Sequence, residues 1–86
     1  MAQARFYWQG EEGASIEAGI ARLWLVAVKH QWAIYEGYTP LGMAARTDED
    51  QTPRGEARLW MRIAAVLQAQ GRKVDDWTVT PTDNQG

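Results

Sequence analysis

Apolar residues recur three or four positions apart between residues 52 and 71, which is the spacing of one face of an amphipathic helix. They are Leu59, Ile63, Val66 and Leu67, with Trp60 beside them. Thr52 suits the N-cap, Pro53 suits the first helical position, and Gly71 suits the left-handed residue that follows a helix. The pattern therefore predicts a helix over residues 53–70, which needs an apolar surface to cover.

Segments that alternate apolar and polar residues, as half-buried strands do, lie on both sides of this helix. In the first of them, Phe6 and Trp8 fall on one face and Tyr7 falls on the other. The segment 10–15 is polar and predicts a loop, and the segment 38–40 predicts the turn of a hairpin. The predicted strands are residues 4–9, 32–37, 41–47 and 74–80.

Residues 16–29 fit two different structures. As a helix they form one apolar stripe, with Ser15 as an acceptable N-cap. As a strand, the run Leu23–Val28 is apolar on both faces, and Gly19 is unfavourable inside a helix. The helix gives the order β-α-β-β-α-β, the split βαβ pattern, whereas a strand over 21–28 gives a β-meander, the long helix and a last strand. Both are α+β folds, with an antiparallel sheet packed on one long helix in the C-terminal half.

The length of 86 residues predicts a small single domain over residues 1–80, followed by a disordered polar tail at 81–86. Five tryptophans, three tyrosines and one phenylalanine can supply the core volume that so short a chain otherwise lacks. We expect Trp24, Trp60 and Trp77 in the core, because they fall on or beside apolar stripes.

Several classes of chemistry are excluded by residue counts. The chain has no cysteine, and its single histidine, His30, and single serine, Ser15, lie in no catalytic or zinc-binding motif. We therefore expect no catalytic residue, no metal and no cofactor; a small enzyme that uses carboxylates is the weaker alternative. Since the chain shows no secretion signal and no apolar run that could span a bilayer, we expect no membrane partner and a cytoplasmic location.

Opposite charges flank the start of the predicted helix. The acidic run at 48–50 favours the positive end of the helix dipole, and it could equally dock on arginines of a partner. Arg54, Arg58 and Arg62 lie four residues apart on one flank, which suits either a solvated face or contact with a phosphate backbone. The net charge of −2 is not typical of a general nucleic-acid-binding protein.

Tyrosines are expected on the sheet surface. Tyr7 and Tyr35 fall on the strand faces opposite the expected core positions, and Tyr38 lies in the predicted turn. Exposed aromatic side chains on a sheet can stack nucleic-acid bases, but the motif that RNA-recognition domains use for this is absent. Exposed tyrosine and tryptophan are equally typical of protein interfaces.

The sequence thus favours a non-enzymatic protein-binding module that acts by occupying a partner's surface. The more specific hypothesis is a phage or mobile-element inhibitor of host defence, of the anti-CRISPR kind, by analogy of size and composition. The alternative is a nucleic-acid-binding module that uses the arginine stripe and the sheet aromatics. We also expect that an exposed sheet edge or aromatic face could pair two copies into a homodimer. The predicted partner-binding residues are Asp48, Glu49, Asp50, Arg54, Arg58, Arg62, Tyr35 and Tyr38.

Overall fold

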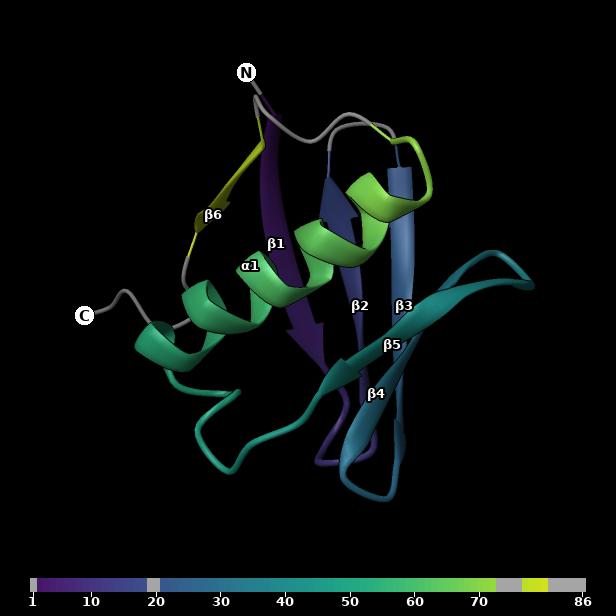
Figure 1. Cartoon of the computed structure of the whole chain (residues 1–86). Coiled ribbons are helices and arrows are strands. Elements are labelled where there is room, and N and C mark those ends of the chain that lie inside the picture. The colour runs from purple at the N-terminus through teal and green to yellow at the C-terminus, as the bar shows by residue number, and fades with distance from the viewer. Residues whose placement is uncertain (1, 19–20, 73–76, 81–86) are drawn as a thin grey trace.

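A computed structural model of the chain describes residues 2–18, 21–72 and 77–80. It confirms the predicted α+β fold, a sheet packed on one helix of the C-terminal half (Figure 1). The elements, in chain order, are β1 (Ala2–Trp8), β2 (Gly13–Ala18), β3 (Ala21–Val28), β4 (Gln31–Glu36), β5 (Thr39–Ala45), α1 (Pro53–Ala69) and β6 (Trp77–Thr80). The predicted tail at 81–86 lies outside the described residues.

The first five strands form an antiparallel meander, and β6 then adds to the free side of β1 in the parallel direction. The strand order is β5-β4-β3-β2-β1-β6. The parallel strand was not predicted. In the segment 16–29, which fitted either a helix or a strand, residues 16–18 belong to β2 and residues 21–28 form β3. The chain therefore follows the β-meander and not the split βαβ pattern. Leu25 and Val26 point to opposite faces of β3: Leu25 is buried and Val26 is exposed.

Two predicted connections lie elsewhere along the chain. The hairpin turn between β4 and β5 is made by Gly37 and Tyr38, so Thr39 and Pro40 belong to β5. Gly37 has a φ of 62°, the left-handed conformation that two-residue hairpin turns favour. The loop between β1 and β2 is shorter than predicted, because β2 already begins at Gly13.

The ends of α1 carry the predicted capping residues. Thr52 is the N-cap, and its Oγ1 accepts a hydrogen bond of 3.0 Å from the backbone N–H of Gly55. At the other end Gly71 has a φ of 81°. The N–H groups of Gly71 and Arg72 donate to the carbonyls of Gln68 and Leu67 respectively, the pattern of a Schellman motif. The helix ends at residue 69, one residue earlier than predicted.

The helix covers one face of the sheet, which we call the inner face; the other is the outer face (Figure 1). Gly42 of β5 allows close contact, because a Cβ atom there would lie 2.6 Å from Cγ1 of Val66. Trp60 is buried as predicted, whereas Trp24 is only half-buried and points to the outer face, so that prediction is wrong. The Trp77 side chain lies outside the described part. The large buried apolar side chains are Phe6, Ile16, Leu23, Leu25, Trp32, Ile34, Leu41, Leu59, Trp60, Ile63 and Leu67.

Candidate functional site

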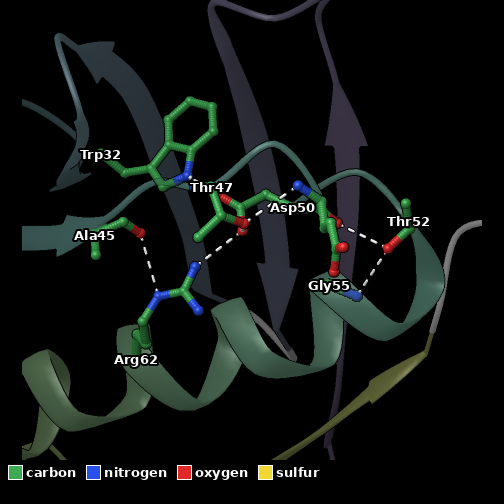
Figure 2. Close-up of polar contacts among 8 residues, drawn as sticks. Trp32, Ala45, Thr47, Asp50, Thr52, Gly55 and Arg62 are labelled. Carbon is green, nitrogen blue, oxygen red and sulfur yellow. Dashed lines mark hydrogen bonds and ion pairs between the residues drawn. The ribbon is translucent and has the colours of Figure 1, made fainter.

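Asp50, which was predicted to bind a partner, is buried with 2% of its surface exposed. Its Oδ2 accepts hydrogen bonds from Nε1–H of Trp32 at 2.7 Å and from the backbone N–H of Thr47 at 2.8 Å. Its Oδ1 accepts from the Thr47 hydroxyl at 2.8 Å and from the Arg62 guanidinium at 2.9 Å (Figure 2). Four donors inside the fold therefore occupy both carboxylate oxygens.

Arg62 also turns toward the protein. Its Nε donates to the carbonyl of Ala45 at 3.2 Å, in addition to the ion pair with Asp50 (Figure 2). Burial alone would raise the pKa of Asp50, but the hydrogen bonds from Thr47, Trp32 and Arg62 outweigh it, so the pKa lies below its ordinary value. Asp50 is thus ionised at neutral pH, and the structure brings it and Arg62 together as an internal pair with little surface for a partner.

A second tryptophan–carboxylate pair lies close to the first. Nε1–H of Trp8 donates to Oε2 of Glu56 at 2.6 Å, and Glu56 is fully buried in the first turn of α1. The rings of Trp8 and Trp32 are 5.7 Å apart. Carboxylates near a helix N-terminus are favoured by the helix dipole. The two pairs therefore fasten the start of α1 to β1 and β4, a role that no local sequence pattern indicated.

The remaining predicted charges are exposed around the start of α1. Asp48 and Glu49 lie in the loop before the helix, and Arg54 and Arg58 lie in its first two turns. Asp48 borders two shallow cavities of about 420 and 350 Å³, the second of which also reaches Arg58. This end of the molecule, which we call the charged end, offers both signs of charge to solvent.

The outer face is apolar and is not covered by any element in the described part of the chain (Figure 1). Two rows of laterally paired residues lie on its antiparallel strands, one across five strands and the other across four. The first row contains Tyr7, Ser15, Trp24, Tyr35 and Pro40, and the second contains Gly13, Val26, Ala33 and Met43. The large side chains left between 41% and 46% exposed on this face are Tyr7, Val26, Val28 and Met43.

Tyr35 and Tyr38, both predicted to bind a partner, meet at one corner of this face. Together with Trp24, Val26 and Gly37 they line a groove of about 540 Å³. Tyr38 is fully exposed at the hairpin turn. Sequence reasoning placed Trp24 in the core and did not single out Val26. The period-two alternation of β3 would have assigned both to the outer face, had the strand been distinguishable from a helix.

The tyrosines and the arginines do not share a surface. Tyr35 and Tyr38 line the outer face, whereas Arg54, Arg58 and Arg62 belong to the helix that packs on the inner face. One nucleic-acid strand could not contact both groups without passing around an edge of the sheet. The arginines and the tyrosines that the nucleic-acid hypothesis combines therefore lie on opposite sides of the sheet.

We predict that Asp50→Asn lowers the free energy of unfolding by about 3 kcal/mol, as expected when one member of a buried ion pair is neutralised. An amide cannot accept from all four donors, so Trp32 or Thr47 would lose its partner. The measurement is urea unfolding, with Asp48→Asn as the control in the same loop. Because Asp48 is exposed, the control should lie within about 0.5 kcal/mol of the wild type. Equal stability of the two variants would contradict the structural role of Asp50.

The stability difference between wild type and Asp50→Asn should depend on pH. Because the folded-state pKa of Asp50 is lowered, its contribution is complete above the unfolded-state pKa and is lost as pH falls through the folded-state pKa. The difference in unfolding free energy between the two proteins should therefore be smaller at about pH 3, which is below the ordinary pKa of aspartate, than at about pH 6. A difference that stays constant or widens in acid would show that protonation of Asp50 does not cause this pH dependence.

Related proteins give no information on the function of this chain. Comparisons with protein-family models, curated proteins and solved structures found no match. Among the described residues, no helix is both long and apolar enough to cross a membrane. The same residues contain no group of three or more side chains that could together hold a metal ion.

Proposed function

We propose that the protein is a non-enzymatic protein-binding module and that the outer face is its binding surface. The observation that carries the proposal is the apolar character of this face, which lies open across five strands. A large exposed apolar patch is typical of a surface that another molecule covers. Trp24, Tyr35 and Tyr38 supply the side-chain types that dominate binding energy at protein interfaces.

The charge on the outer face favours a protein over a nucleic acid. Arg5, Glu17 and Arg22 form one laterally paired row at its border, and Arg22 makes an ion pair with Glu17. Binding a phosphate backbone requires several cations that are free to replace counterions, and this row offers few. Nucleic-acid binding through Arg54 and Arg58 at the charged end stays the alternative prediction.

The narrower hypothesis is an inhibitor that occupies a functional surface of a host-defence protein in the cytoplasm. Its support is the composition and small size of the chain, together with a binding face that needs no cofactor. The exposed residues of the charged end, Asp48, Glu49, Arg54 and Arg58, would add charge contacts to such a partner.

A photo-cross-linking amino acid placed at Tyr38 tests the proposed function directly. We predict covalent adducts to a protein chain when the labelled protein is irradiated in cells of its natural host, because Tyr38 borders the binding groove. The control carries the same amino acid at Met61, which is 72% exposed on α1 and outside the outer face. Adducts should be read by mass on a denaturing gel. Protein adducts from position 61 alone, or from neither position, would reject the outer face as a protein-binding surface.

A further inference from the structure

We propose that the partner at the outer face is a second copy of this chain, so that two sheets pack face to face in a two-fold symmetric dimer. The inference rests on the proposed function, because it names the occupant of the same surface. The occupant follows from the two edges of the sheet and from the charge, the area and the shape of the outer face.

Both edges of the sheet are poor sites for strand pairing, which favours self-association through the face. At one edge β6 has only four residues, and at the other the free edge of β5 is obstructed. The carbonyl of Leu41 accepts a hydrogen bond of 2.9 Å from Nε2 of Gln70, and the carbonyl of Ala45 accepts from Arg62. Pro40 removes one backbone donor from the same strand. Side chains of α1 and of its C-cap residue, Gln70, thus occupy edge carbonyls that an added strand would need.

The charge of the outer face selects a neutral partner. The two rows that cross it contain no formal charge, and the charged row of Arg5, Glu17 and Arg22 lies at its border. A strongly acidic or basic partner would have to desolvate its charges against tyrosine, valine and methionine without compensation. A second copy presents the same two uncharged rows, so its outer face fulfils this requirement.

The area of the face reaches the lower limit for a specific pair. Five strands about 4.8 Å apart and about six residues long, at about 3.3 Å per residue, give a footprint of about 500 Å². Two copies would together bury about 1,000 Å², the lower limit for a specific protein interface. The side chains that stand above this plane, Tyr38 foremost, add to the area.

The outer face carries both parts of a self-complementary contact. Tyr38 projects at the hairpin turn, and the groove beside it is lined by Trp24, Val26 and Tyr35. A two-fold interface uses the same patch on both subunits, so a projection and a recess on one face are each matched by the partner copy. Aromatic side chains that fill recesses contribute much of the binding energy at protein interfaces.

Sedimentation equilibrium of the full chain over a concentration series tests the proposal. The wild type should show a species of twice the 9.7 kDa chain mass. Val26→Lys, which places a charge in the middle of the face, should raise the dimer dissociation constant at least about tenfold. The matched control is Met61→Lys, an equally charged change at an exposed apolar residue of α1, which should leave the constant unchanged. Met43→Lys is a second variant on the face, for use if circular dichroism shows that Val26→Lys does not fold.

A wild-type chain that stays monomeric throughout the series overturns the second copy as the occupant. A dimer that is weakened by Met61→Lys, or by neither lysine on the outer face, places the interface elsewhere and also overturns the proposal. Failure here is distinguishable from failure of the proposed function. A monomeric chain whose position 38 cross-links to a different protein retains protein binding at the outer face and excludes the second copy.

Discussion

One helix has one apolar stripe, so it can cover only one face of a sheet. In this protein the 17 residues of α1 cover the inner face, and the outer face keeps its own apolar rows. The described residues contain one helix, and it lies on the inner side, so none of their elements covers the outer face. The bare face is thus a direct consequence of the element order, and the proposed protein binding would remove it from water.

The position of α1 on the inner face is fixed at its first turn. Two indole N–H groups of the sheet, from Trp8 and Trp32, donate to buried carboxylates at the start of the helix. Because an unpaired buried carboxylate is costly, these bonds specify where the helix lies as well as contributing to stability. They also take Asp50 out of the set of charges that a partner can reach. In a face-to-face dimer the helices lie on the outside, so both copies would present their charged ends to further partners.

The parts of the fold that depend on neighbouring residues were predictable from the sequence. Thr52, Pro53 and Gly71 specify the ends of α1 within a few residues of themselves, and the predicted helix differs from the observed one by a single residue. Residues 16–29 could not be assigned, because a strand that is apolar on both faces has no period of its own. Pairing with β1 and β4 decides their structure, and that pairing lies outside the segment.

The candidate site was less predictable for the same reason. Tyr35 and Tyr38 were identified because they fall on the polar side of an alternating strand and in its turn. Asp50 resembles its exposed neighbours Asp48 and Glu49 in sequence, and the approach of Trp32 and Arg62, 18 and 12 residues away, distinguishes it. Trp24 was assigned to the core because it falls on an apolar stripe, and large apolar side chains are also what an interface exposes in the free chain.

The shape of the particle in solution tests the central claim, that the outer face of one copy covers that of another. The chain measures 35 × 33 × 18 Å along its principal axes, and the outer face is one of its broad sides. Stacking two copies through this face doubles the thin dimension and keeps the longest axis close to 35 Å. Small-angle X-ray scattering should therefore report a compact particle of twice the chain mass. A particle of that mass with about twice the length, as edge-to-edge pairing would give, or a particle of one chain mass, would contradict the account.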